Sequence, residues 1–280
     1  MNASQTKKWK KDVKEGNERF GGYLVAINRI GEEKINNQGC SMKIVEYNKF
    51  SNIVVEFQDE HKYKVNNTYG NFKAGCIKNP YYPSVYGVGI TGIKYPTHIN
   101  CKNTKEYHAW TEMLRRCFDE EHNNRQPTYK EVICCEEWLF YENFYEWLHS
   151  QPNFDKWYNG KRWAIDKDIL FKRNKFYSPN TCCLVPQNVN CLFTKREADR
   201  GKYPIGVKES EWGFEANCHN PFINRSETLG SYATPELAFN AYKKYKENLI
   251  KKVAQIEFEA GNITEDCYQA MMNYQVEIDD

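Results

Sequence analysis

The sequence predicts an α+β protein made of successive small modules, and three patterns support this prediction. The first third holds short β-branched runs between turn residues, which favours a small β-barrel-like module, either a barrel or a strongly bent sheet. The middle section has apolar residues at helical spacing, followed by two short strands and a helix that carry a cluster of polar residues. The last section predicts a three-stranded sheet and then a helix with an N-terminal cap.

Composition narrows the class of protein. The chain has 280 residues, of which 40% are hydrophobic and 15% aromatic, enough for two or three small cores. No apolar run approaches a membrane span, and the polar N-terminus lacks the apolar centre of a signal peptide. An odd number of cysteines, 11, without a Cys-x-x-Cys pair argues against a disulfide framework and a structural zinc site. We therefore expect a cytoplasmic protein without a membrane partner.

Charge is distributed unevenly along the chain, although the net charge is only +2. Residues 161–252 hold 17 Lys or Arg against 10 Asp or Glu, a net charge of +7. Residues 253–280 hold 7 acidic residues and no basic one. The basic block favours a polyanionic partner. The acidic segment is either a solvated cap or a negative arm that competes with that partner for the basic block.

The N-terminal part divides into a charged leader, residues 1–20, and a β module, residues 21–92. The leader clusters four lysines around Trp9, which suits either a solvated chain end or a contact with backbone phosphates. In the β module, Met42–Tyr47 and Ile53–Phe57 are the clearest strands. The aromatic and lysine side chains of this module either contact nucleic acid or form its core and rim.

A linker over residues 91–103 leads into the central domain, residues 104–200. Apolar residues between Tyr107 and Cys117 recur at helical spacing, and two arginines near the end of this run suit the helix dipole. The stretch from Glu136 to Leu148 predicts a second, aromatic amphipathic helix that packs against the hairpin that follows it.

The polar cluster lies in Trp163–Leu192. Two apolar strand candidates enclose a basic turn and a Tyr-Ser-Pro-Asn turn, and a short helix is predicted over Gln187–Phe193. This order gathers five polar side chains around one end of a hairpin: Asp166, Asp168, Asn174, Asn188 and Asn190. Carboxylate and amide oxygens suit a hard cation such as Mg²⁺, and such an ion can stabilise the oxygen displaced from a phosphodiester.

The hairpin resembles the ββα-metal hairpin of the HNH nuclease superfamily, and more closely a branch found in bacteriophage homing-endonuclease-like proteins. Three motifs carry the resemblance: Ile165-Asp166-Lys167-Asp168, Tyr177-Ser178-Pro179-Asn180-Thr181-Cys182, and Asn190. Two upstream motifs of the same branch occur in the same order, at Trp110–Cys117 and Cys135–Trp138. The exit of the β module at Asn79–Gly89 is also similar to that of the phage proteins.

The resemblance implies a divalent cofactor, Mg²⁺ or Mn²⁺, held by Asp166 and Asn190. Asp168 and Asn174 would support the ion, and a water near Lys167 would attack the phosphodiester. It also implies that the central domain, 104–200, is the catalytic one.

The residue at the position of the general base differs from the family pattern. HNH enzymes normally have His beside the first metal ligand, and this chain has Lys167, which stays protonated near neutral pH. His108, His122 and His149 lie close enough in the chain to fold back toward the hairpin. Each is either an ordinary surface residue or a substitute base.

The next section, residues 201–254, resembles the plant ethylene-response-type (Apetala-type) DNA-binding domain, in which a three-stranded sheet lies in the major groove and a helix backs it. The matching residues are Gly206-Val207, Phe214, Ala216, Leu229-Gly230, Tyr232, Thr234, Glu236, Ala238 and Ala241-Tyr242. If Phe214, Ala216 and Cys218 face the helix, strand alternation turns Glu215, Asn217 and His219 outward. The candidate DNA contacts of the two modules are Lys172, Arg173, Lys175, Lys208, Trp212, Asn217, His219 and Arg225. The acidic segment, residues 255–280, then holds a helix near Thr264–Tyr274.

Two functions fit these observations. The first is a phage-type HNH endonuclease that hydrolyses duplex DNA with a divalent metal in the cytoplasm of a bacterial host cell. The alternative is a catalytically inactive protein on the same scaffold, which regulates through DNA binding or blocks a host defence protein through its surface. Lys167 in place of the expected His favours the alternative.

Overall fold

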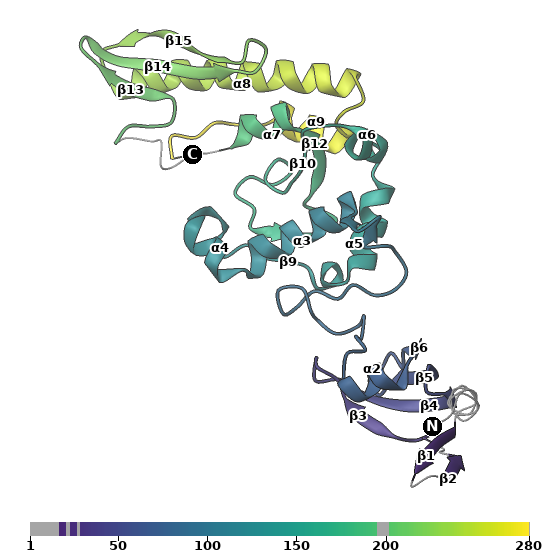
Figure 1. Ribbon diagram of the computed structural model, residues 1–280. Helices are drawn as coiled ribbons and strands as arrows, with labels where there is room; N and C mark the ends of the chain where they lie inside the picture. Colours follow the sequence, from purple (N-terminus) through teal and green to yellow (C-terminus); the bar gives the residue numbers. More distant parts are fainter. Residues whose placement is uncertain (1–16, 21–22, 27–28, 195–201, 280) are drawn as a thin grey trace. The chain divides into compact units, whose positions relative to one another are not determined.

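The computed structural model describes residues 17–20, 23–26, 29–194 and 202–279, and its fold is mixed α and β (Figure 1). The chain divides into two compact units, Met1–Lys94 and Tyr95–Asp280. The lysines around Trp9 lie outside the described residues. In the part of the chain that the structure describes, no helix is long and apolar enough to cross a bilayer.

The first unit is an open antiparallel sheet of four strands in the order β3-β4-β5-β6, accompanied by a separate β1-β2 hairpin. Its strands are β1 (Asn17–Phe20), β2 (Tyr23–Ala26), β3 (Glu33–Ile35), β4 (Ser41–Lys49), β5 (Asn52–Phe57) and β6 (Lys64–Asn67). None of the described sheets closes into a barrel, so of the two forms predicted for residues 21–92, barrel or sheet, the structure has the open sheet. The leader was expected to extend to residue 20, but β1 already begins at Asn17.

One face of this sheet is covered by a short helix, α2 (Tyr69–Ala74), that the sequence did not predict. Met42 and Ile44 of β4 are buried against it together with alternate residues of β5, as the period of a half-buried strand requires. The helix begins where the Thr68 hydroxyl accepts a hydrogen bond from the Asn71 N–H and ends at Gly75, whose φ is +71°. The added helix explains why the sheet stays open: its apolar face already has a partner.

The second unit begins with a helical layer around buried aromatic side chains. Its elements are β7 (His98–Ile99), β8 (Lys102–Asn103), α3 (Lys105–Phe118), α4 (Glu120–Arg125), η1 (Pro127–Tyr129), β9 (Ile133–Cys134), η2 (Glu136–Leu139), α5 (Tyr141–Ser150) and α6 (Phe154–Asn159). Trp110, Trp138 and Phe144 are fully buried in this layer. The single helix predicted over Glu136–Leu148 is wrong, because the backbone at Phe140 is extended (φ −91°, ψ 121°) and separates η2 from α5.

The predicted hairpin and helix follow in the expected order. Strand β10 (Trp163–Asp166) pairs antiparallel with β12 (Cys183–Pro186), and this register places Asp166 opposite Cys183. Between them, β11 (Phe176–Tyr177) pairs in parallel with β9. Helix α7 covers Gln187–Phe193, the residues predicted for it.

The C-terminal elements are a three-stranded antiparallel sheet lying along a long helix (Figure 1). They are β13 (Val207–Ser210), β14 (Gly213–Asn220), β15 (Arg225–Tyr232), α8 (Pro235–Glu259) and α9 (Glu265–Met272). The predicted cap is present, since the Thr234 hydroxyl accepts a hydrogen bond from the Leu237 N–H. Gly206 approaches the Tyr242 ring so closely that a Cβ there would lie 2.1 Å from a ring carbon, which explains the glycine at this position.

The hairpin, the C-terminal sheet and the acidic segment share one hydrophobic core. It joins Val185 and Val189 of the hairpin region to Ala216 of the sheet, Ile250 of α8 and Met271 of α9. The sequence placed these parts in three separate segments, 104–200, 201–254 and 255–280, whereas the structure packs their apolar faces on one another. The acidic segment is therefore partly structural.

Candidate functional site

A cavity of about 770 Å³ lies beside the hairpin in the second unit. Helix α3, strand β10, the loop after it, helix α7 and the chain after α9 all contribute to its wall. The predicted site residues on this wall are Asp166, Lys167, Asp168, Asn174 and Asn190. The cavity is thus the place where the predicted hairpin cluster meets the rest of the domain.

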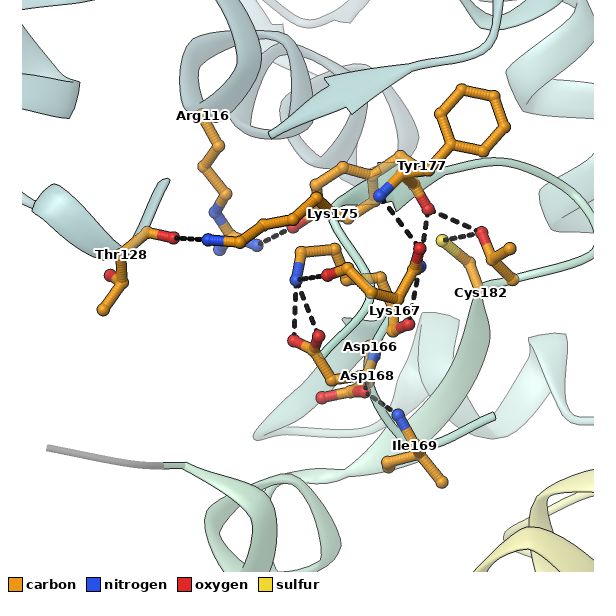
Figure 2. A network of polar contacts seen from close by, with 12 residues as sticks. Arg116, Thr128, Asp166, Lys167, Asp168, Ile169, Lys175, Tyr177 and Cys182 are labelled. Atoms are coloured by element: carbon orange, nitrogen blue, oxygen red, sulfur yellow. Dashed lines mark hydrogen bonds and ion pairs between the residues drawn. The ribbon is translucent and has the colours of Figure 1, made fainter. Parts of the chain in front are cut away.

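Asp166 ends β10 and is 8% exposed (Figure 2). Its Oδ1 accepts hydrogen bonds from the backbone N–H groups of Asp168 at 2.7 Å and Ile169 at 2.9 Å. Burial raises the pKa of this carboxyl above its ordinary value, and the two N–H donors offset only part of the effect. A buried carboxylate that borders a cavity and is costly to ionise suits a bound cation.

Lys167 is locked into the loop that follows β10. Figure 2 shows its ammonium directed at the Asp168 carboxylate, where it donates to the two oxygens at 2.9 and 2.7 Å. It also donates to the carbonyl oxygen of Asn174 at 2.6 Å. An ammonium held by these acceptors cannot take a proton from water, so Lys167 does not replace the histidine base. The same contact compensates the charge of Asp168, which makes Asp168 a weaker candidate for a cation than Asp166.

Asn174 lines the cavity, and its side chain holds the loop after β10 together. Its amide nitrogen donates to the carbonyl oxygens of Lys167 at 2.8 Å and Phe176 at 2.7 Å. Its Oδ1 accepts from the backbone N–H of Phe176 at 3.0 Å. These hydrogen bonds fix the loop that positions Lys167 and Asp168, and the catalytic or metal-supporting role of Asn174 stays a prediction.

The two asparagines of α7 point in different directions. Asn190 lies on the cavity wall, and no hydrogen bond of its side-chain amide occurs among the described residues. The Asn188 amide instead donates to Glu257 Oε1 of α8 at 2.6 Å. Residues two apart on a helix lie about 200° apart around its axis, so the two amides cannot serve one site. The grouping of Asn188 with the cluster was wrong.

Of the six histidines, all in the described part of the chain, His108 is the one on the cavity wall. His149 instead lies 3.2 Å from Glu106, and His122 stacks on Tyr129. His108, Glu112 and Arg116 are spaced four residues apart on α3 and all line the cavity. This polar stripe opposite the apolar face of α3 was the signal in the sequence that could have identified the wall.

Several cations surround the same cavity. Arg116 donates to the Tyr177 hydroxyl at 3.1 Å, and Lys175 donates to the carbonyl oxygen of Thr128 at 3.2 Å. Lys172 and Arg173 lie on the loop between β10 and β11. Lys105 donates to carbonyl oxygens at the end of α6, and burial lowers its pKa. The predicted contacts Lys172, Arg173 and Lys175 therefore lie beside Asp166, and the sequence missed Lys105 and Arg116.

The candidate contacts of the C-terminal sheet form a separate, less basic surface. Ala216 and Cys218 are buried toward α8 and His219 is exposed, in agreement with the predicted alternation. Lys208 is paired with Glu215 at 2.9 Å across the two strands, so its charge is compensated. Asn217 accepts a hydrogen bond from the Thr228 hydroxyl at 2.9 Å. Arg225 is exposed at the start of β15, and Trp212 is 87% exposed in the β13-β14 turn.

Comparison of the chain with protein-family profiles, with curated proteins and with solved structures found no match. Among the described residues, no group of three or more His, Cys, Asp or Glu side chains is arranged to hold a metal ion. The class of protein is therefore inferred from the chemistry of the cavity.

Proposed function

We propose that the protein is an HNH-type endonuclease that hydrolyses phosphodiester bonds of duplex DNA with a divalent metal. The observation that carries the proposal is the cavity wall itself: a buried carboxylate, an amide and an imidazole lie within a set of cationic side chains. Cations bind the phosphates of the backbone, and the acidic centre is where a metal would meet the scissile group.

Asp166 and Asn190 are the residues that would hold the ion. Oδ1 of Asp166 is engaged by two backbone N–H groups, which orient the carboxylate and leave Oδ2 for a cation. A site with one carboxylate and one amide is small, but Mg²⁺ commonly keeps several waters and binds through one or two carboxylates and the substrate phosphate. When bound, such an ion stabilises negative charge on the phosphodiester oxygens and lowers the pKa of water.

We assign the role of general base to His108. Its imidazole lies on the cavity wall and can serve as a general base, whereas the Lys167 side chain donates to Asp168 and to the carbonyl oxygen of Asn174. Lys172, Arg173 and Lys175 bind and orient the phosphate backbone along the hairpin, and Arg116 adds a fourth cation from α3.

The test is single-turnover cleavage of supercoiled plasmid with Mg²⁺ or Mn²⁺ and with an EDTA control. Asp166→Ala should abolish cleavage, and His108→Gln should slow it by about a hundredfold, the lower end of the range for a general base. Asn188→Ala, on the other side of α7, is the matched control and should cleave like the wild type. Cleavage that survives both EDTA and Asp166→Ala would place the chemistry elsewhere.

A non-cutting DNA-binding protein is the second candidate, and the Lys167–Asp168 ion pair is the observation that favours it. The pair engages the Asp168 carboxylate, which lies two residues from the proposed metal ligand Asp166. Its lysine stands where HNH enzymes have the histidine base. Such a protein would act on gene expression through DNA, or on a host defence protein through an exposed surface such as that around Trp212. Salt-dependent DNA binding without nicking under any metal condition would select this candidate.

A further inference from the structure

We propose that Tyr274–Asp279, hereafter the C-terminal arm, is a built-in competitor for the phosphate-binding cations of the cavity. The proposal rests on the proposed function, which identifies duplex DNA as the ligand with which the arm competes. It adds a mode of regulation to that site: the chain supplies its own carboxylates to cations that DNA phosphates would otherwise contact.

The acids of the arm are paired with the basic loop of the hairpin. Glu277 Oε2 lies 2.9 Å from Lys172 Nζ and 3.3 Å from an Arg173 guanidinium nitrogen. Asp279 Oδ2 lies 2.7 Å from the same Arg173 nitrogen. Two of the three hairpin cations assigned to DNA are therefore occupied by carboxylates about 100 residues further along the chain.

The arm also lines the cavity that holds the proposed site. Tyr274 and Asp279 are on the same wall as Asp166 and Asn190. The Tyr274 ring packs edge to face on Phe193 of α7, with the ring centroids 4.9 Å apart. A duplex whose phosphates contact Lys172 and Arg173 would meet the carboxylates of the arm in the same place.

The arm is anchored by its buried residue Val276, by the Tyr274 ring and by a hydrogen bond from Lys172 Nζ to the Gln275 carbonyl oxygen at 2.9 Å, while its acids stay near the solvent. Val276 is 3% exposed, its N–H donates to Glu247 Oε1 at 2.9 Å, and its carbonyl oxygen accepts from Lys243 Nζ at 2.8 Å. Glu277 and Asp279, which follow the anchor, keep half or more of their side-chain surface exposed. Exposed ion pairs are individually weak and screened by salt, so the contact is suited to displacement by a polyanion.

The test uses charge-neutralising substitutions, because deletion of the segment would remove Cys267, Met271 and Val276 from the core. The test variant is Glu277→Gln/Asp279→Asn in the full-length chain. The matched control is Glu259→Gln/Asp266→Asn, which removes two exposed acids from the same acidic segment, away from the cavity wall. Affinity for a short fluorescent duplex is measured in EDTA, so that binding is separated from cleavage.

The test variant should bind the duplex about fivefold to thirtyfold more tightly than the control at 50 mM salt, because it loses three ion pairs whose acids are exposed. This advantage should shrink at 200 mM salt because exposed charges are screened. Equal or weaker binding by the test variant would overturn the proposal. If neither protein binds duplex at any salt concentration, the assignment of DNA as the ligand fails. Binding of heparin, another polyanion, then tests the competition alone. Tighter heparin binding by the test variant supports the competition, and equal binding overturns it.

Discussion

Replacing Asp166 by asparagine separates the cost of burying a carboxylate from its use in holding a cation. The asparagine Oδ1 can accept the two backbone N–H bonds that Asp166 Oδ1 accepts, so the turn after β10 keeps its geometry. The buried charge disappears, and with it the penalty that raises the pKa of Asp166. We therefore expect Asp166→Asn to stabilise the metal-free protein and to abolish its stabilisation by Mg²⁺.

The expected gain is that of a typical stabilising substitution, and its pH dependence follows from linkage. A single substitution that removes an unfavourable interaction of the folded state typically stabilises a protein by about 1 kcal/mol. For a unit of this size that equals a rise in melting temperature of about 3 °C. The pKa of Asp166 is raised in the folded state. The wild type is therefore most stable at a pH below the pKa that Asp166 has in the unfolded chain, and it loses stability as the pH rises through the pKa of the folded state. The advantage of Asp166→Asn should thus be present at pH 7 and vanish in acid.

Urea unfolding followed by tryptophan fluorescence is a suitable assay, since six of the seven tryptophans lie in residues 95–280. It is run at pH 7 in EDTA, at acid pH, and at pH 7 with excess Mg²⁺. Asp155→Asn, an exposed acid on α6, is the control and should change stability by less than about 0.5 kcal/mol. This reasoning would be refuted if Asp166→Asn were less stable than the wild type in EDTA. It would also be refuted if Mg²⁺ stabilised Asp166→Asn as much as it stabilises the wild type.

Two further substitutions test the loop after β10. Asn174→Ala removes three hydrogen bonds to the backbone and should lower the unfolding free energy by about 2 to 3 kcal/mol in the same urea assay. A change below about 0.5 kcal/mol would contradict the structural role of this residue. Lys167→His places an imidazole beside Asp166 and, in the His108→Gln background, should restore single-turnover plasmid cleavage by about a hundredfold. An unchanged rate would mean that the position of Lys167 is not one from which water can be deprotonated.

The local features of the fold could be predicted from the sequence. The hairpin order, the extent of α7 and the cap at Thr234 depend on neighbouring residues, and the structure has all three. The alternation along β14 was predicted correctly because one face of the sheet packs on α8.

Features that depend on contacts distant in the sequence were missed or wrong. The break at Phe140 interrupts a continuous apolar pattern, and nothing in the local spacing marks it. The place of His108 beside the hairpin depends on how α3 packs, and the roles of Lys167 and Asn174 depend on contacts seven residues away. The choice between Asn188 and Asn190 was within reach, since helical geometry alone excludes their sharing a site.

The shared core of the second unit has a consequence for the order in which the protein can mature during synthesis. Asp166 and Asn190 emerge early, but the apolar face beneath their hairpin is covered by Ile250, Met271 and Val276. Domains fold as units once their sequence is available, so a nascent chain that ends before these residues has the site residues without the core that supports them. We therefore expect the proposed cleavage activity to be absent from chains halted between residues 200 and 270 and to arise only late in translation.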